Sequence, residues 1–195
     1  MTARPRGGFR SLGSRKLARL GLIGDEVVVR LDGDQLVLTG ADGGTLAIPA
    51  AAVDRLRHFG TELVHELPEN IPPTFEVKIW WGGRRAPVFL TPFADHKAYG
   101  AVIGGFAERV AAWRGIDRLM VGPGYTTAIV NLLIVVPPCL LLFGLLLALS
   151  IWDSAWWWLA TVPLLALFAW LGGRNIVSRW PRRVASIAAF KTHLP

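Results

Sequence analysis

Two uncharged apolar runs in the second half of the chain constrain its folding more than any other feature. They cover residues 126–150 and 155–173, and a short linker containing Asp153 separates them. A helix of about 20 apolar residues spans the roughly 30 Å hydrocarbon core of a bilayer, because each residue rises about 1.5 Å. We therefore expect a hairpin of two transmembrane helices, helix 1 over 126–150 and helix 2 over 155–173.

The charges around the two runs predict an orientation. Arginines precede the first run and follow the second, whereas the linker has no Lys or Arg. Basic residues near the ends of a span are retained in the cytoplasm, so we expect a multi-pass protein of the inner membrane with both termini cytoplasmic. The residues expected to anchor the hairpin at the membrane interface are aromatic or basic: Tyr125, Trp152, Trp156, Trp157, Trp158, Arg174, Arg179, Trp180, Arg182 and Arg183.

Pro137 and Pro138 interrupt the first run. Each proline lacks a backbone donor and crowds the preceding turn, so a helix kink is the interpretation we favour over a gate or a ligand-binding break. Neither run contains an acidic, basic or histidine residue. Pumps and ion pathways normally need such groups, so the sequence argues against transport by this chain alone.

The remaining charge is unevenly distributed. Residues 1–24 carry six Lys or Arg and no acid, and residues 174–195 form a basic, amphipathic tail that we expect to lie in the cytoplasm as an interfacial helix beginning near Pro181. A simple stop-transfer charge cluster with a flexible end is the alternative for this tail. The segment between, 25–122, has thirteen acids against ten bases. Basic flanks around a mildly acidic domain favour anionic lipid headgroups as partners, and not nucleic acid.

Residues 25–121 are expected to form one cytoplasmic domain. Apolar, β-branched runs at 26–31, 35–39 and 45–48 are separated by Asp/Gly turns, which predicts an antiparallel meander. Before them, residues 9–22 fit a helix or a strand equally well. The single cysteine, Cys139, excludes an intrachain disulfide.

The period of the pattern changes over residues 49–67. Apolar residues recur there at steps of three and four, which predicts an amphipathic helix. On such a helix His58, Glu62 and His65 share a face that can hold a divalent metal. A solvated polar face is the interpretation we favour, and we expect no cofactor.

Residues 75–90 predict a β-hairpin with a Gly82–Gly83 turn. Alternation points Val77, Ile79 and Trp81 to one side and Trp80 to the other. The outward tryptophan either forms a contact surface near the turn or packs under the N-terminal segment or a loop. The residues proposed for lipid or partner contact are Lys78, Trp80, Trp81, Arg84 and Arg85.

Asp95 is expected to cap a helix over 96–114. An apolar stripe runs along it at steps of three and four residues, from Tyr99 to Trp113. Gly100, Gly104 and Gly105 lower its helix propensity by about 1 kcal/mol each relative to Ala, and close packing against a sheet is the expected reason for them.

Three segments carry a resemblance to a known family: TLAIPAAAVDRL (45–56), FEVKIWWGGRRAPVFLTP (75–92) and DHKAYGAVIGGFAERVAAW (95–113). With the preceding strands they resemble the bacterial pleckstrin-homology-like (PH/GRAM-like) domains. The resemblance implies a curved sheet plugged by a terminal helix, and binding of lipids, peptides or proteins. The basic first hairpin of many phosphoinositide-binding members does not transfer, because Asp32, Asp34 and Asp42 occupy the early turns.

The sequence thus predicts an α+β membrane protein, in which an antiparallel, β-rich, PH-like cytoplasmic domain with a terminal amphipathic helix precedes a transmembrane helical hairpin. The expected function is a membrane-anchored interaction module that binds lipid headgroups or a protein partner. The alternative is an accessory or assembly subunit, whose hairpin packs on an integral membrane protein or on a second copy of the chain. No nucleophile–base pair or nucleotide-binding motif is evident, so we do not expect an enzyme, although folding can assemble a site that motifs miss.

Overall fold

The computed structural model describes residues 7–60, 74–123 and 180–195, with isolated positions between (129, 133, 137, 138, 140, 141, 144 and 170). The chain divides into two compact units, one of Met1–Gly122 with Arg182–Pro195 and one of Pro123–Pro181. All the named helices and strands belong to the first unit. The last residues of the chain therefore fold with the domain that precedes the apolar runs.

The first sheet is an antiparallel meander in the order β1-β2-β3-β4. Its strands are β1 (Gly8–Leu12), β2 (Glu26–Asp32), β3 (Gln35–Gly40) and β4 (Thr45–Pro49). Gly33, in the turn between β2 and β3, has a φ of 53°, which a glycine adopts without a steric penalty. The three strands predicted between 26 and 48 are confirmed. Residues 9–22 contain both a strand, β1, and a short helix, α1 (Arg15–Ala18).

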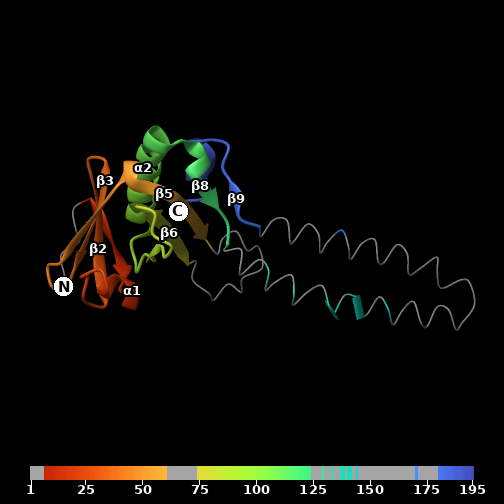
Figure 1. Cartoon of the computed structure of the whole chain (residues 1–195), viewed down its shortest axis with the longest axis horizontal. Coiled ribbons are helices and arrows are strands. Elements are labelled where there is room, and N and C mark those ends of the chain that lie inside the picture. Colours follow the sequence, from red (N-terminus) through yellow and green to blue (C-terminus); the bar gives the residue numbers. More distant parts are fainter. Residues whose placement is uncertain are drawn as a thin grey trace, which may run out of the picture. The chain divides into compact units, whose positions relative to one another are not determined.

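The second sheet has the order β7-β6-β5-β8-β9. The predicted hairpin is confirmed as β6 (Phe75–Trp81) and β7 (Val88–Leu90), and β6 pairs on its other side with β5 (Val53–Gly60). The strand β8 (Leu119–Val121) lies parallel to β5, and β9 (Arg182–Arg183) pairs with β8. Figure 1 shows β2 and β3 on one side of the domain and β5, β6 and β8 toward the other.

The prediction of a helix over residues 49–67 is wrong for residues 49–60, the part that the structure describes. Residues 50–52 form a single 3₁₀ turn, η1 (Ala50–Ala52), and 53–60 form the central strand β5. A β-bulge between Val53 and Arg55 explains the misleading pattern. The extra residue puts buried Val53 and Leu56 three positions apart, a helix-like step, although they face the same core. From Leu56 to Gly60, successive residues pair with successive residues of β6, as in a regular strand. Residues 61–67 lie outside the described residues.

The helix α2 (His96–Arg114) forms as predicted and packs against both sheets. The Asp95 carboxylate accepts a hydrogen bond from the Ala98 amide at 3.0 Å, as an N-cap does. Its stripe is buried from Tyr99 to Val110, whereas Trp113 is 61% exposed and donates to Asp34 Oδ2 at 3.2 Å. After α2, the 3₁₀ turn η3 (Ile116–Arg118) leads into β8.

The C-terminal segment differs from the expected interfacial helix. Pro181 precedes the strand β9, and the only helix described in 182–195 is α5 (Ile187–Lys191). Val184 and Phe190 are buried in the core of the domain. A β-carbon on Gly100 meets the carbonyl oxygen of Pro195, and one on Gly104 meets Leu194 at 3.2 Å. These two glycines therefore make room for the C-terminal segment, and only Gly105, against Leu31, has the expected role of packing near a sheet.

The structure corrects the expected transmembrane hairpin. Among the residues it describes, no helix is both long and apolar enough to cross a membrane. The longest of them, α2, has 19 residues but includes a lysine, a glutamate and two arginines, whereas a span needs a nearly uncharged run. The fold supported by the structure is a β-rich domain, and the predicted multi-pass placement in the inner membrane is not supported. The ranges 126–150 and 155–173 lie outside the described residues, apart from isolated positions.

Candidate functional site

The outer face of the second sheet gathers aromatic and cationic side chains. Along β6 the inward residues Val77, Ile79 and Trp81 are buried, and Trp80 on the outer face is half-buried, as the hairpin pattern predicts. Arg55 lies opposite Trp80 in the register of β5 and β6. The guanidinium carbons of Arg55 and Arg57 are each 5.4 Å from the centre of the Trp80 ring. These cation–π contacts hold two arginines on one tryptophan.

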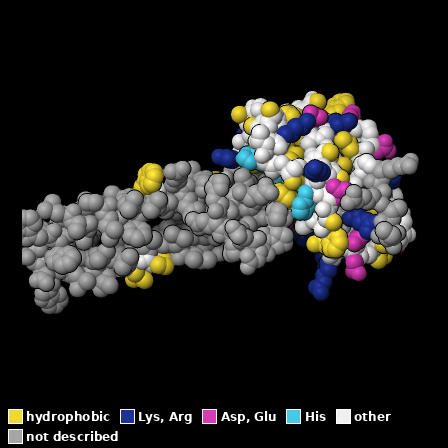
Figure 2. Space-filling model, turned by 180° about the vertical axis from the view of Figure 1, so that it is seen from behind, with side chains coloured by type: hydrophobic (Ala, Val, Ile, Leu, Met, Phe, Trp, Pro, Cys, Tyr) yellow, Lys and Arg dark blue, Asp and Glu magenta, His cyan; other side chains and the backbone are white. Residues whose placement is uncertain are grey.

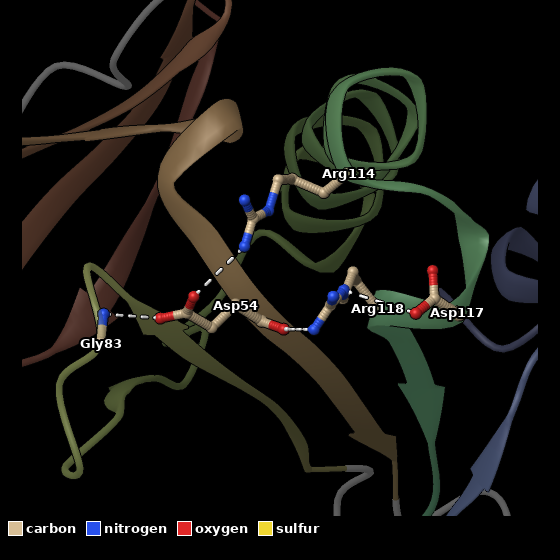
Figure 3. Close-up of polar contacts among 5 residues, drawn as sticks. All are labelled: Asp54, Gly83, Arg114, Asp117 and Arg118. Atoms are coloured by element: carbon tan, nitrogen blue, oxygen red, sulfur yellow. Dashed lines mark hydrogen bonds and ion pairs between the residues drawn. The ribbon is translucent and has the colours of Figure 1, made fainter.

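Asp54 connects this face to the rest of the domain (Figure 3). One oxygen of its carboxylate accepts a hydrogen bond from the Gly83 amide at 2.8 Å, and the other is 3.5 Å from Arg114 at the end of α2. The main-chain oxygen of Asp54 is 3.5 Å from Nη1 of Arg118 in η3. Asp54 sits at the bulge of β5, so the bulge aims its carboxylate at the β6–β7 turn. Both oxygens are thus occupied, and the carboxylate positions neighbours rather than acting as an available base.

A cavity of about 290 Å³ opens where these elements meet, lined by Asp54, Arg55, Trp80, Gly83, Arg84 and Arg118. Ligand pockets in proteins are commonly about 300–1,000 Å³, so this one suits a small group and not a drug-sized molecule. Three arginines face a single carboxylate that already has partners. We call these six residues the arginine pocket.

The arginines of the pocket have donors to spare. In the described parts of the chain, neither Arg55 nor Arg84 is paired with a carboxylate; their contacts are the rings of Trp80 and Trp81, with Arg84 4.7 Å from the latter. The buried Nε of Arg118 lies 3.4 Å from Oδ2 of Asp117, an ion pair without hydrogen-bond geometry, so the donors available in the pocket are those of Arg55 and Arg84. A guanidinium offers five donors in a planar fork suited to carboxylate and phosphate. The arginine pocket is therefore chemically suited to an anion.

The structure brings together only part of the predicted contact set. Trp80 and Arg84 line the arginine pocket, whereas Trp81 is buried beneath the turn. Lys78 forms an ion pair with Glu76 at 2.8 Å and lies over the ring of Phe89. Arg85 is exposed in the turn and does not line the pocket.

Three of the predicted membrane anchors lie among the described residues. Arg182 and Arg183 form the exposed strand β9, and Trp180, just before it, is also exposed. Tyr125, Trp152, Trp156, Trp157, Trp158, Arg174 and Arg179 lie outside the described residues. Pro137 and Pro138 are exposed positions in helical backbone, and the kink there stays a prediction.

Sequence reasoning missed Asp54, Arg55, Arg57 and Arg118. The first three fell within a segment read as a helix, although the alternation of Arg55, Leu56, Arg57 and His58 is the period of a strand. Arg118 follows α2 by four residues and reaches the pocket only because η3 turns the chain back toward β5. Figure 2 shows basic, acidic and apolar side chains interspersed on one face of the described domain.

The second polar cluster is buried in the core and holds the C-terminal segment. His58 of β5 is fully buried, with Nε2 2.7 Å from the main-chain oxygen of His193 and Nδ1 2.9 Å from the hydroxyl of Tyr99. A carbonyl only accepts, so Nε2 carries the proton and Nδ1 accepts from Tyr99. Desolvation lowers the pKa of His58 to about 4, and the hydrogen bond to His193 opposes this shift only in part. Burial likewise raises the pKa of Tyr99.

The predicted metal-binding face does not form around His58. The residue lies in a strand and not on a helix, and its two ring nitrogens are already hydrogen-bonded. Glu62 and His65 lie outside the described residues. In the parts of the chain that are described, no group of three His, Cys, Asp or Glu residues is placed to hold a metal ion.

No family model matches the chain, and neither the curated proteins nor the solved structures contain a match.

Proposed function

We propose that the described domain is a protein-interaction module that binds an acidic group of a partner in the arginine pocket. The observation that carries the proposal is the excess of guanidinium donors there. Arg55 and Arg84 have no carboxylate partner among the described residues. A carboxylate entering the pocket gains charge-assisted hydrogen bonds that the protein itself does not make.

We further propose that the fold is of the pleckstrin-homology-like type that the sequence resembles. A four-stranded antiparallel meander, β1 to β4, is followed by β5, β6 and β7 and then by α2, which packs on both sheets. This order of elements supports the proposal. It is consistent with binding of peptides or proteins.

The pocket is preorganised for this role. Stacking on Trp80 and Trp81 restricts Arg55 and Arg84 before any ligand arrives, so less side-chain entropy is lost on binding. Asp54 fixes the turn through the Gly83 amide and reaches Arg114 with its second oxygen. Because the Asp54 carboxylate is already paired, it repels an incoming anion less than an unpaired carboxylate does.

The test uses the full-length protein and a fluorescent hexaglutamate peptide, with binding followed by fluorescence anisotropy. Loss of charge-assisted hydrogen bonds costs about 1.5–3 kcal/mol, so we expect Arg84→Glu to weaken binding about tenfold to a hundredfold. Arg85→Glu is the matched control, because Arg85 is the next residue in the same turn and does not line the pocket. Hexaglutamine controls for peptide binding without charge.

Two results contradict the proposal. One is an equal loss of affinity in Arg84→Glu and Arg85→Glu, which indicates attraction by net charge alone. The other is equal binding of hexaglutamate and hexaglutamine to the unsubstituted protein. Circular dichroism spectra of both variants check that the fold is retained.

A further inference from the structure

The outer face of the second sheet continues beyond the arginine pocket. In the strand register Arg57 lies opposite Lys78, and Lys78 lies opposite Phe89 on β7. This row is next to the pair of Arg55 and Trp80. Cationic and aromatic side chains thus lie together on three neighbouring strands, from the pocket toward β7.

A cation from another element ends this row. The ammonium group of Lys16, in α1, lies 4.4 Å from the centre of the Phe89 ring, and that of Lys78 lies 4.5 Å from it. The charge of Lys78 is matched by Glu76 at 2.8 Å. Lys16 is exposed and has no carboxylate partner among the described residues. Lys16, positioned over the ring of Phe89, is therefore available to bind a second anionic group.

We infer that Lys16 and Phe89 form a second anchor, and that the ligand is an extended acidic peptide crossing β6 and β7 from the arginine pocket to Lys16. The inference rests on the proposed function of the pocket and specifies the length and charge pattern of its ligand. We call Lys16, Arg55, Arg57, Lys78, Trp80, Arg84, Phe89 and Arg118 the basic-aromatic face.

The positive charge of the basic-aromatic face indicates an acidic ligand. Of the cations on the basic-aromatic face, Lys78 is paired with Glu76 and Arg118 with Asp117, and the carboxylate of Asp54 is paired with Arg114. Lys16, Arg55 and Arg84 have no carboxylate partner among the described residues. Its aromatic rings favour a peptide over single-stranded nucleic acid. Cations already lie over the rings of Trp80 and Phe89, whereas bases bind such surfaces by stacking on exposed rings.

Strand geometry sets the spacing of the acidic groups. Trp80 and Phe89 are one strand apart and, because Lys78 lies opposite Phe89, two residues apart along the strands. With about 4.8 Å between strands and about 3.3 Å per residue, their α-carbons are roughly 8 Å apart. Trp80 belongs to the arginine pocket and Phe89 to the second anchor, so the acidic side chains must be at least two residues apart. Alternate residues of an extended peptide share a face, so spacings of two and four are favoured.

Two probes separate the anchors. Hexaglutamate is about 20 Å long when extended and reaches both. Both peptides are acetylated at the N-terminus and amidated at the C-terminus. In diglutamate the two side chains point to opposite sides, so it presents one carboxylate to the face. We measure binding of each to the full-length protein by titration of the amide chemical shifts.

We expect Lys16→Glu to weaken hexaglutamate binding by up to about fivefold and to leave diglutamate binding unchanged, because an exposed pair is worth up to about 1 kcal/mol. Arg84→Glu weakens both peptides. Arg15→Glu, the neighbouring exposed residue of α1, is the matched control and changes neither beyond the small effect of net charge. Lys16→Gln removes the charge without reversing it and gives a smaller loss in the same direction.

The remaining outcomes test the second anchor, the arginine pocket and the nature of the ligand separately. If Lys16→Glu leaves hexaglutamate unchanged while Arg84→Glu weakens it, the second anchor is refuted and the arginine pocket stands. If Arg84→Glu affects neither peptide, the proposed function fails as well. Tighter binding of hexathymidylate than of hexaglutamate, lost in Trp80→Ala, overturns the assignment of an acidic peptide and indicates nucleic acid.

Discussion

Acidification should loosen the domain through one buried histidine. His58 is fully buried and neutral, with a folded-state pKa of about 4 against an ordinary value of 6.5. The unfolded chain therefore takes up a proton first as the pH falls. Stability is lost as the pH falls from about 6.5 toward 4, and the loss from this group ends below about 4.

The size of the effect follows from the two pKa values. A difference of about two and a half units corresponds to roughly 3 kcal/mol in full, of which about 2 kcal/mol is lost between pH 7 and pH 5. The assay is urea denaturation of the full-length protein at both pH values, followed by circular dichroism. An unchanged m-value shows that the same surface is exposed in both transitions.

A matched variant assigns the effect to His58. In His58→Gln the amide can donate to the His193 oxygen and accept from the Tyr99 hydroxyl, but it does not titrate. We expect this variant to lose much less stability than the unsubstituted protein between the two pH values. His193→Gln keeps the main-chain oxygen and controls for the second histidine, whose pKa is lowered by partial burial and by Arg182. Equal acid sensitivity in His58→Gln and the unsubstituted protein refutes the reasoning.

Four further substitutions test the contacts that hold the domain and its site in place. Gly100→Ala should destabilise the domain by about 1–3 kcal/mol in urea denaturation, because the added β-carbon meets the main-chain oxygen of Pro195, and this outweighs the better helix propensity of Ala. Gly104→Ala should cost less stability in the same assay, because its β-carbon meets only the flexible end of the Leu194 side chain. Asp54→Ala should cost about 1 kcal/mol of stability and weaken hexaglutamate binding by loosening the turn, whereas unchanged binding would show that Asp54 does not position the pocket. Asp95→Ala should lower stability by about 1 kcal/mol through loss of the N-cap and leave peptide affinity unchanged.

Local patterns predicted the elements whose contacts are local. The β2–β3–β4 meander follows from Asp/Gly turns between β-branched runs, and α2 begins at its predicted cap and ends at its predicted last residue. The alternation along β6 correctly placed Trp80 outward and Trp81 inward. In each case a period of two or of three to four is uninterrupted over the whole element.

The failures arise where distant segments meet or a period is broken. The bulge in β5 made a strand resemble a helix, and this hid Arg55 and Arg57 from the site prediction. The contact of the C-terminal segment with α2 joins residues far apart in sequence, through glycines that fit either a sheet or a chain end. The uncharged runs led to the expectation of a membrane hairpin, for which the described residues provide no spanning helix. The arginine pocket likewise combines β5, the β6–β7 turn and η3, and no local motif encodes it.

The most direct test of the central claim follows the indole N–H resonance of Trp80 during titration of the full-length protein with hexaglutamate. The resonance is assigned by its absence in Trp80→Phe. We predict a saturable shift of Trp80, while Trp113, exposed and bonded to Asp34, stays in place. A shift of Trp113 as large as that of Trp80, or no saturable shift of Trp80, would contradict binding of an acidic group in the arginine pocket.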